Sequence, residues 1–380
     1  MTIPFPLARN APPVQLLDVR LREACFSDHA AIAALEAAQG LKPKALAEWR
    51  ALWEGNPCYR EIGPSWPIGW VIETSDGKIA GSLCNLPLPY VYRGQKLLIA
   101  TGRGWAVDER YRSYALLLMD AYLSQSRVDL FLNTTVNGSA AAAFGVFGSA
   151  RVPVGDWGSA AFFITRYRGF AESALRIKQS SQPHLLSYPV GLALYVKERF
   201  TAKRISATEI PVEFSRDFDE RFDPFWEALS RDRQKLLAVR DRAVLRWHFS
   251  ASLARQELWV LTVSRNAAIQ ACAIFQRRDE PQFGLKRMRM VDFQALHSRA
   301  EFSAAILRRA LEQCRAQGIH ALENVGCGLE NTRVFDQFAP YRRKLSAWSC
   351  FYLSRRPELA ESLRNPSAWA PSSYDGDSSV

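Results

Sequence analysis

The residues of this chain with the clearest chemistry form a short basic turn, Arg110 to Ala115, between a β-rich run and an apolar helix. The β-rich run covers residues 97–107, and the helix covers residues 115–123. A helix N-terminus presents unpaired N–H donors and the positive end of the helix dipole, so it favours an anion. Arg110 and Arg112 add charge-assisted donors suited to phosphate. The turn therefore predicts a site for the pyrophosphate of a cofactor.

A second group of residues follows on the next expected strand and helix, over residues 128–135 and 138–147. Asn133 lies on the strand, and Asn137 stands just before the helix, where its side chain can cap the first turn. Both amides are suited to hydrogen bonds with the amide groups of a bound cofactor.

The turn is similar to the Arg/Gln-x-x-Gly-x-Gly/Ala signature of the GNAT (Gcn5-related) acyl-CoA N-acyltransferases. Arg110 matches its first position and Ala115 its last, whereas Ser113 stands where that family usually has glycine. The second group resembles the Asn-x-x-Ala, aromatic and Gly-Phe pattern that follows in the same family. Its matching residues are Asn137, Ala140, Phe144 and Gly148, with Ser149 in place of the phenylalanine.

This resemblance implies an acetyl-CoA or another acyl-CoA as co-substrate, with no metal. In the family, the strand before the turn pairs with pantetheine through its backbone, and a backbone N–H stabilises the developing oxyanion. The residues assigned to the acyl-CoA are Trp105, Ala106, Val107, Arg110, Tyr111, Arg112, Ser113, Tyr114, Ala115, Asn133, Asn137 and Phe144.

N-acyl transfer also requires a group that removes a proton from the acceptor ammonium. No single residue stands out, and the candidates are Asp292, Asp375 and His248; Glu109 is better read as a charge that caps the helix. Arg103 and Asp377 are the candidates for binding the acceptor.

The leaving thiolate raises a separate question at position 144. Many GNAT enzymes place a tyrosine there to protonate the thiolate, and Phe144 cannot donate a proton. Because a thiol with a pKa of about 8.5 leaves as a thiolate with little help, acyl transfer does not require a tyrosine at this position. Water, Ser139 or Ser149 are the substitutes that the sequence offers.

These residues need a scaffold, and the order of expected helices and strands predicts an α/β (α+β) fold of two tandem GNAT-like modules. Each module is expected to be a central mixed sheet flanked by helices, and a strand pair near 151–167 is expected to complete the first one. The expected divisions are an extended arm (1–17), a GNAT domain with the acyl-CoA site (18–170), a connector (171–210), a degenerate GNAT-like domain (211–356) and a C-terminal tail (357–380).

The second module repeats the pattern of the first without its chemistry. Asn331 and Phe338 have the same spacing as Asn137 and Phe144, but the phosphate turn has no counterpart near Asp292. We therefore expect only the first module to hold CoA, and the second to serve as a scaffold and a wall of the acceptor site.

Two segments leave alternatives open. Leu192 to Phe200 can form a short basic amphipathic helix, for which packing between the two domains is favoured over contact with a membrane surface. The polar composition of residues 366–380 favours a disordered tail. The alternative is that this tail folds back over a cleft between the domains, where its carboxylates could meet an acceptor amine.

Composition bounds the class of protein. The chain has 380 residues and a formal net charge of +11, which favours anionic partners, but its basic residues are scattered. The apolar run 185–196 is too short to span a bilayer and contains Pro189. Seven cysteines show no metal-like spacing, and with no leader-like segment we expect a cytoplasmic protein without a membrane span.

The expected function is acyl transfer, most simply acetyl transfer, from acyl-CoA to the amine of a small molecule such as an amino sugar or a biosynthetic intermediate. Three alternatives remain. The donor could be an acyl carrier protein or an aminoacyl-tRNA, the one case in which nucleic acid is expected, or the module could bind without catalysis. The acceptor, the acyl length, the base and the oligomeric state are left open by the sequence.

Overall fold

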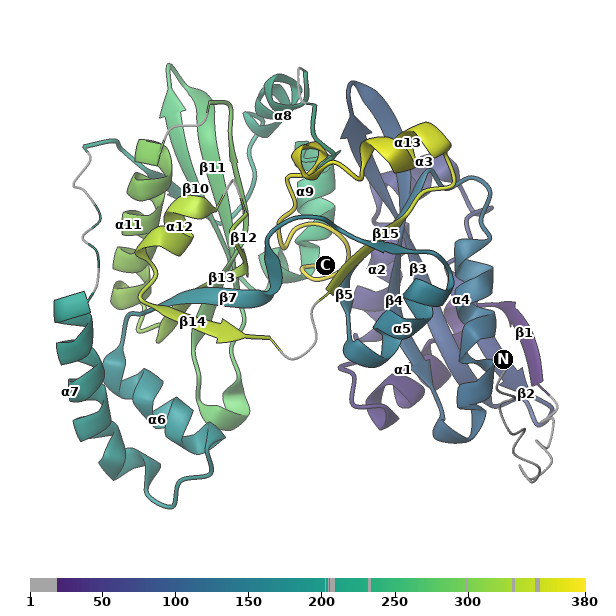
Figure 1. The fold of residues 1–380 in the computed structure, drawn as a ribbon, viewed down its shortest axis with the longest axis horizontal. Helices are drawn as coiled ribbons and strands as arrows, with labels where there is room; N and C mark the ends of the chain where they lie inside the picture. Colours follow the sequence, from purple (N-terminus) through teal and green to yellow (C-terminus); the bar gives the residue numbers. More distant parts are fainter. Residues whose placement is uncertain are drawn as a thin grey trace, which may run out of the picture.

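The computed structural model describes residues 19–380, except 202, 204, 206–208, 232–233, 298–299, 330–331 and 346–348. The expected arm over residues 1–17 and Asn331 lie outside the described residues. Within the described part, the strands form two sheets, of eight and seven strands. The sheets lie side by side, each flanked by helices (Figure 1). The predicted fold class is confirmed.

The first sheet has the order β1-β2-β3-β4-β5-β15-β6, with β9 beside β3. Its neighbouring strands are antiparallel except β4 and β5, which are parallel. Its strands are β1 (Val19–Glu23), β2 (Gly69–Thr74), β3 (Ile79–Tyr92), β4 (Gln95–Val107), β5 (Leu130–Val136), β6 (Ala150–Arg151), β9 (Leu237–Ala238) and β15 (Ser349–Leu353).

The second sheet has the order β14-β7-β13-β12-β11-β10-β8, and its one parallel pair is β12 with β13. Its strands are β7 (Asp156–Ile164), β8 (Glu213–Ser215), β10 (Leu258–Arg265), β11 (Ala268–Arg277), β12 (Arg287–Ala295), β13 (Ala321–Cys327) and β14 (Tyr341–Lys344). Both sheets thus follow one plan, in which a parallel pair succeeds a meander of antiparallel strands.

The two halves of the chain exchange strands. β7 follows the first half in sequence but pairs with β13 and β14 of the second sheet, and β15 returns to pair with β5 and β6 of the first. In Figure 1 these two segments cross between the halves. The expectation that residues 151–167 complete the first sheet is therefore wrong for β7. The residue pattern predicts a strand here correctly but does not specify its sheet. Because β7 is buried on much of both faces, it suits the interior of either sheet.

Helices cover the faces of both sheets and fill the space between them (Figure 1). The α-helices are α1 (His29–Ala38), α2 (Leu46–Glu54), α3 (Pro57–Ile62), α4 (Ala115–Leu123), α5 (Gly138–Val146), α6 (Tyr167–Ile177), α7 (Pro183–Thr201), α8 (Phe222–Ser230), α9 (Arg242–His248), α10 (Ser250–Ala254), α11 (Ala300–Ala316), α12 (Arg333–Phe338) and α13 (Pro357–Ser362). The 3₁₀ helices are η1 (Phe26–Asp28), η2 (Glu109–Tyr114), η3 (Pro281–Phe283) and η4 (Pro366–Ala368).

One hydrophobic core is shared by the two halves. It includes Tyr90 of β3, Phe222 of α8 and Trp247 of α9, together with Trp369 and Tyr374 near the C-terminus. Since these side chains are buried against one another, the halves form one packed unit rather than two linked domains.

The C-terminal residues fold back into the space between the sheets, so the expectation of a disordered tail is wrong. Leu236 N donates to Ala368 O at 2.7 Å, and the Tyr374 hydroxyl donates to Val239 O at 2.8 Å. The Thr134 hydroxyl donates to Asp375 O at 3.0 Å. Buried aromatic side chains and these backbone contacts outweigh the polar composition of the segment.

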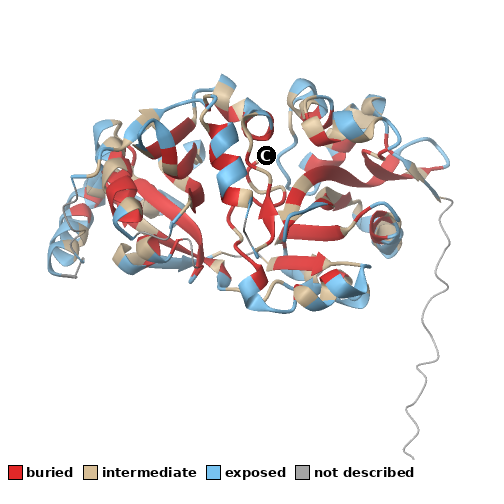
Figure 2. Cartoon of the chain, turned by 90° about the horizontal axis from the view of Figure 1, so that it is seen from above, coloured by how far each residue is buried: buried red, intermediate tan, exposed pale blue. Residues whose placement is uncertain are grey.

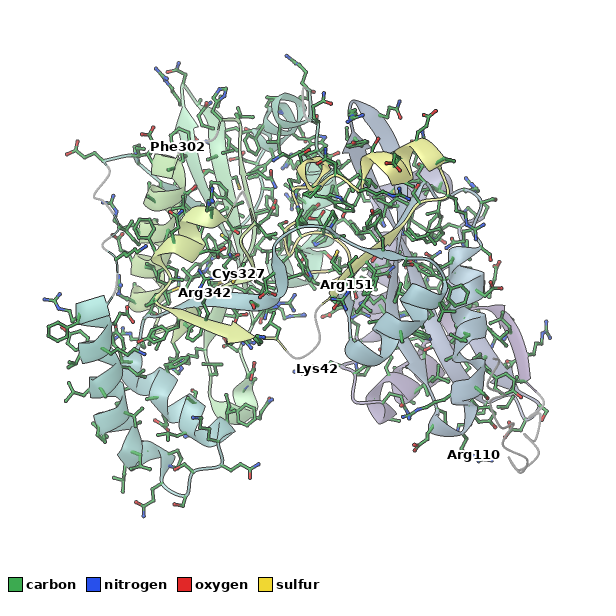
Figure 3. The ribbon with its side chains drawn as sticks, viewed as in Figure 1. Lys42, Arg110, Arg151, Phe302, Cys327 and Arg342 are labelled. Atoms are coloured by element: carbon green, nitrogen blue, oxygen red, sulfur yellow. The ribbon has the colours of Figure 1, made fainter. Side chains whose placement is uncertain are left out.

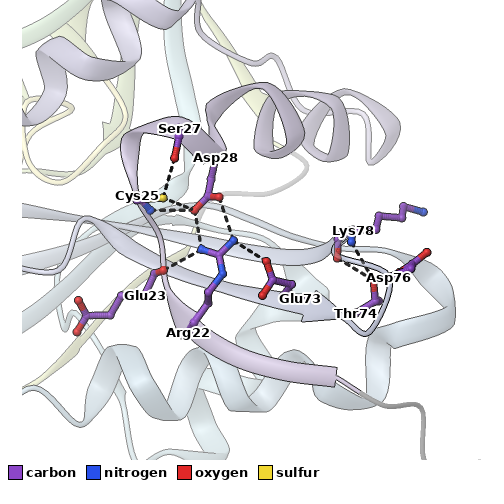
Figure 4. Close-up of polar contacts among 9 residues, drawn as sticks. All are labelled: Arg22, Glu23, Cys25, Ser27, Asp28, Glu73, Thr74, Asp76 and Lys78. Atoms are coloured by element: carbon purple, nitrogen blue, oxygen red, sulfur yellow. Dashed lines mark hydrogen bonds and ion pairs between the residues drawn. The ribbon is translucent and has the colours of Figure 1, made fainter.

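The start of α1 is fixed by a small ion-pair network at the edge of the first sheet (Figure 4). The Arg22 guanidinium donates to both carboxylate oxygens of Asp28, at 2.8 and 3.0 Å, and to Glu73 of β2 at 2.9 Å. These bonds tie the entry to α1 to strands β1 and β2, and burial of Ile32 and Leu35 then holds the helix on the sheet. The orientation of α1 matters because its last turns reach the candidate site.

Helix α7 does not pack between the two halves, contrary to the favoured expectation for residues 192–200. It lies at the far end of the second sheet and contacts α6 (Figure 1). Among the described residues, no helix is both long and apolar enough to cross a membrane.

Candidate functional site

The site begins where β4 and β5 separate. Along these two fully described strands, parallel pairing joins only Ile99 to Leu130 and Ala100 to Phe131. At the next step the Asn133 side chain stands between the strands: its Oδ1 accepts the Gly102 N–H at 2.8 Å. A side-chain amide thus takes the place of a backbone partner, and the strands diverge beyond it.

A β-bulge widens the opening on the other edge of β4. Ser82 pairs with Ala106 and Cys84 with Arg103, so Gly104 and Trp105 together face the single residue Leu83. Gly104 has a φ of +65°, which glycine adopts without strain. The bulge therefore turns the Arg103–Trp105 segment away from regular pairing.

The bulge also brings a carboxylate onto the strand. A Cβ at position 104 would collide with Glu36 Oε1, so a larger residue would push the Glu36 carboxylate of α1 away from the strand. The bulge and the nearby Glu36 carboxylate therefore explain why position 104 is a glycine.

These features line a cavity of about 540 Å³. Its walls come from the loop between α1 and α2, the diverging ends of β4 and β5, the start of α5, two residues of the second half and the C-terminal segment. The lining residues are Glu36, Leu41, Lys42, Pro43, Lys44, Ala45, Glu48, Leu83, Gly102, Arg103, Gly104, Trp105, Met119, Tyr122, Asn133, Thr135, Val136, Asn137, Ala140, Phe144, Arg255, Arg278, Asp377, Ser378 and Val380.

Three polar atoms of lining residues are buried without a hydrogen-bond partner among the described residues. They are Glu36 Oε1, Trp105 Nε1 and Arg278 Nε. Leaving a buried polar group unpaired costs about 1–3 kcal/mol, and more for a charge. The cavity thus presents one hydrogen-bond acceptor and two donors, one of them cationic, that have no partner among the described residues. A bound polar ligand would supply the missing hydrogen bonds.

Burial sets the protonation of the acidic groups at the cavity. It raises the pKa of the Glu36 carboxyl, against the opposing effect of Arg103, His29 and Lys44. Burial also raises the pKa of Asp377, although Arg103 and a hydrogen bond from the Thr135 hydroxyl, at 3.0 Å, favour its ionised form. Both carboxyl groups are thereby moved toward the range in which they can exchange a proton near neutral pH.

The cavity also gathers cations that repel one another. Burial, together with the nearby charge of Arg103, lowers the pKa of Lys44 to about 8. Burial lowers the pKa of Arg278 to about 10, with repulsion from Arg289. Arg255 differs because it forms an ion pair with Glu48 at 2.6 Å.

Of the residues predicted from the sequence, the structure brings Arg103, Trp105, Asn133, Asn137, Phe144 and Asp377 together on this cavity. Asn137 caps α5, since its Oδ1 accepts the Ala140 N–H at 2.8 Å. Asn133 is engaged with Gly102 and with the Tyr122 hydroxyl, at 3.2 Å, which makes it a wedge between strands. Phe144 stacks on Phe351 with ring centroids 5.6 Å apart.

The basic turn lies elsewhere. Among the described residues that line the cavity, Arg110 and Arg112 are absent, although both are assigned to the acyl-CoA from the sequence. The turn forms η2, and both arginines are exposed. Figure 3 shows Arg110 at the outer edge of the first half, away from Lys42.

The other turn residues, Tyr111, Ser113, Tyr114 and Ala115, lie with the two arginines on η2 and at the start of α4. Ala106 and Val107 pair with Ser82 and Gly81 of β3 beyond the bulge. None of these six residues is among the described residues that line the cavity. The Asp108 carboxylate accepts the Arg110 N–H at 3.1 Å, so one amide of the predicted anion site is already occupied.

The three predicted bases are buried, and none is among the described residues that line the cavity. Asp292 forms a buried ion pair with Arg240, with Nε 2.6 Å from Oδ2. Asp375 accepts hydrogen bonds from the Tyr90 hydroxyl at 2.8 Å and from Ser372 N at 2.7 Å.

His248 lies 2.7 Å from the Ser379 hydroxyl, measured from Nε2, and burial lowers its pKa to about 3. All three residues are thus engaged with buried partners, and none is among the described residues that line the cavity.

Sequence reasoning missed Glu36, Lys44 and Arg278. A signal existed for Glu36, because it follows Ile32 by four residues and adjoins Leu35, so it falls on the apolar side of a predicted helix. A carboxylate at such a position requires a reason. Lys44 and Arg278 carried no comparable signal, since they reach the cavity from a loop and from the second half.

The corresponding opening in the second sheet is filled. β12 and β13 pair only from Arg287–Ala321 to Met290–Asn324 along these fully described strands. Beyond that point Asn324 Nδ2 donates to Asp336 Oδ1 at 2.9 Å, and Phe293 packs on Phe335 at 5.9 Å between ring centroids.

Comparison with known proteins places the fold. No protein-family model and no curated protein matches the sequence. Among solved structures, the chain is similar to a GCN5-related N-acetyltransferase from Anabaena variabilis, with a TM-score of 0.51 and 13% identity over 88% of this chain and 72% of that one. It is also similar to Saccharomyces cerevisiae N-myristoyltransferase with bound myristoyl-CoA and inhibitors, with a TM-score of 0.56 and 10% identity over 90% and 82% of the two chains. At these identities the likeness shows the fold, which is the GNAT fold over most of the chain.

Proposed function

We propose that this protein is an acyl-CoA-dependent N-acyltransferase whose acceptor is a small amine. The observation that carries the proposal is the opening between β4 and β5, held apart by Asn133 and bordered by the Gly104 bulge. Such an opening leaves strand backbone available to an extended ligand, and solved structures of the same fold include a complex with myristoyl-CoA.

The donor half of the site would be formed by residues from both diverging strands. Trp105, Asn137 and Phe144 line the cavity and would surround the acyl end. Arg110 follows Trp105 by five positions, a separation of at most about 18 Å of extended chain. One long co-substrate would therefore contact the cavity at its acyl end and the exposed arginines of η2 at its phosphate end, with no need for those arginines to enter the cavity.

The acceptor half would be formed around Glu36. Its carboxylate has an unpaired oxygen directly above Gly104, and its raised pKa suits it to take a proton from an ammonium group. The Trp105 indole N–H, also unpaired, would donate to a carbonyl oxygen of the bound ligands. Asp377 adds a second carboxyl on the same wall.

Loss of the thiolate needs no tyrosine in this scheme. Phe144 is buried and packs its ring against Phe351 and Trp105, so it supplies shape rather than a proton. A thiol with a pKa of about 8.5 leaves as a thiolate at modest cost, and solvent would then protonate it.

The cations favour an acceptor that carries an anionic group as well as an amine. Lys42, Lys44 and Arg278 line the cavity, and among the described residues none of the three forms an ion pair with a carboxylate. A carboxylate or phosphate on the acceptor would relieve their repulsion and satisfy Arg278 Nε, while the amine faces Glu36.

The test is release of CoA thiol from acetyl-CoA and longer acyl-CoAs in the presence of paired amines. The pairs are glucosamine with glucosamine 6-phosphate, and β-alaninamide with β-alanine. The proposal predicts turnover, with the anionic member of at least one pair preferred about tenfold, and loss of that preference in Lys44→Gln and Arg278→Gln. Equal use of both members of each pair would refute the anionic acceptor and leave acyl transfer intact.

The donor is tested separately, by thermal-shift titration with the acetyl-CoA analogue in which a methylene group replaces the thioester sulfur. Stabilisation supports the donor assignment. No stabilisation by any CoA, combined with turnover by loaded acyl carrier protein or by aminoacyl-tRNA, would replace CoA as the donor. No turnover with any of these donors would support a binding module without catalysis.

A further inference from the structure

Helix α7 turns its hydrophobic side chains away from the protein. Eight large apolar or aromatic residues of this helix are exposed: Leu185, Leu186, Tyr188, Val190, Leu192, Tyr195, Val196 and Phe200. Leu185 and Leu192 are each 63% exposed, and Phe200 is 86% exposed. A single exposed leucine is ordinary, but a continuous set on one helix marks an interaction surface.

The face of α7 that packs on the protein is the one with small residues. Ser187 and Gly191 are buried, and Leu194 and Glu198 are partly buried. A Cβ at position 191 would lie 3.0 Å from Arg168 Cα, so glycine lets α7 approach the backbone at the start of α6. The helix is thus held by its small face while its apolar face points outward.

The outward face is broad. At 100° per residue, the exposed apolar side chains cover roughly 220° of the helix circumference. A helix that binds a protein groove usually offers a narrow stripe of anchors at i, i+3, i+4 and i+7. A face wider than half of the helix is better matched to the flat boundary between lipid headgroups and acyl chains. Figure 2 shows α7 as a mainly blue and tan helix at one end of the molecule.

The surroundings of this face are basic. Residues 166–201 contain six lysines and arginines and two glutamates. Glu172 is paired with Arg176 at 2.6 Å, and Glu198 is partly buried beside Tyr167 and Tyr341. The exposed charge of the α6–α7 hairpin is therefore mainly positive, which complements anionic headgroups and would oppose the same face of a second copy.

We propose that the α6–α7 hairpin binds the surface of anionic membranes, with the outward face of α7 inserted at the headgroup boundary. The arginine side chains assist by stacking: the Arg168 guanidinium lies 3.8 Å from the centroid of the Tyr188 ring, which holds a charge beside the apolar face. This inference does not depend on acyl transfer, because the hairpin lies at the far end of the second sheet from the cavity.

The experiment is co-sedimentation of the whole chain with vesicles of phosphatidylcholine, with and without phosphatidylglycerol. The wild type is expected to bind the vesicles that contain phosphatidylglycerol and to be released by salt. The double variant Leu192→Glu/Phe200→Glu is expected to bind at least about tenfold more weakly, since two apolar side chains no longer enter the membrane.

The matched control is Leu116→Glu/Val146→Glu, which places the same charges at exposed apolar positions of α4 and α5. It should bind as the wild type does. A milder variant, Leu185→Ser/Leu192→Ser, guards against an effect of added charge, and circular dichroism checks that all variants fold.

Two results would overturn the proposal. One is wild-type binding to no vesicle, or binding that the α7 variants leave unchanged. The other is a dimer of the wild type in light scattering that Leu192→Glu/Phe200→Glu converts to a monomer, because the face would then be an interface between copies of this chain.

Discussion

Replacing Glu36 with glutamine separates the chemistry of the cavity from its packing. The substitution keeps the size and one oxygen of the side chain but removes the negative charge. Glu36 is 2% exposed, lies over Gly104 and has an oxygen without a hydrogen-bond partner among the described residues. If it accepts the proton of the acceptor ammonium, its loss should lower kcat/KM by about 10²- to 10⁴-fold, the usual contribution of a general base.

The same substitution should stabilise the fold. Burial raises the pKa of Glu36 above its unfolded value, so the folded state binds its proton more tightly than the unfolded state does. The associated stability is complete below the unfolded pKa and is lost as pH rises through the folded pKa. At pH 7 the buried carboxyl group therefore supports folding less than it does below its unfolded pKa, and a permanently neutral side chain should recover about 1–3 kcal/mol.

The assay pairs steady-state acyl transfer with thermal unfolding at pH 5 and pH 7. We expect Glu36→Gln to be nearly inactive, to unfold at a higher temperature than the wild type at pH 7, and to differ less from it at pH 5. Glu61→Gln, at the exposed end of α3, is the matched control and should change neither quantity. Full activity of Glu36→Gln would refute its role as the base. A clearly lower unfolding temperature of Glu36→Gln at pH 7 would refute the view that the buried Glu36 carboxylate lacks partners that stabilise its charge.

Four further predictions follow from the same geometry. Arg110→Glu/Arg112→Glu should raise the Kd of the methylene analogue of acetyl-CoA in calorimetry at least about tenfold without changing the unfolding temperature, and an unchanged Kd would remove η2 from the donor site. Arg240→Met leaves Asp292 buried without its partner and should cost about 3–5 kcal/mol in urea unfolding, whereas a small loss would show that water or another group compensates. Because the pKa of Lys44 is lowered to about 8, the KM of an anionic acceptor should rise above pH 8 in the wild type and not in Lys44→Arg; parallel profiles would count against Lys44. The pKa of His248 is lowered to about 3, so the stability that this residue confers is present above its unfolded pKa of about 6.5 and is lost as pH falls toward 3. The unfolding temperature of His248→Gln should therefore decline less steeply than that of the wild type between pH 6.5 and pH 3. An identical decline would contradict the burial of a neutral imidazole.

The local sequence pattern was sufficient to predict the strands and the helix start that form the site in the first half. Residues 97–107 and 128–135 were expected as strands, and they form most of β4 and β5. Their alternation and β-branched content fix strand formation locally. Asn137 was expected to cap the next helix, and it does so through Ala140 N. The resemblance at Arg110–Ala115 and Asn137–Gly148 then pointed to the fold that the structure shows.

Long-range arrangement escaped the sequence because it depends on partners that no local pattern specifies. β7 and β15 are ordinary strands whose sheets are chosen by packing of the whole chain. The tail from Trp369 to Val380 has a polar composition, yet Trp369 and Tyr374 bury it in the core shared by both halves.

The residues of the candidate site also fall into those that the local sequence predicts and those that only the fold brings together. Residues next to the recognised motifs, such as Trp105 and Phe144, line the cavity as expected. Glu36, Lys44 and Arg278 come from three distant segments, and only the folded chain brings them together. Asp292, Asp375 and His248 were chosen for their chemistry alone, and each is buried in a partnership that removes it from the cavity.

The most direct test is a crystal structure of the protein with the acetyl-CoA analogue in which a methylene group replaces the thioester sulfur. We expect the acyl end in the opening between β4 and β5, beside Trp105 and within reach of Glu36, with the phosphates near Arg110. A ligand bound elsewhere, or an opening filled by protein with no ligand under saturating conditions, would contradict this expectation.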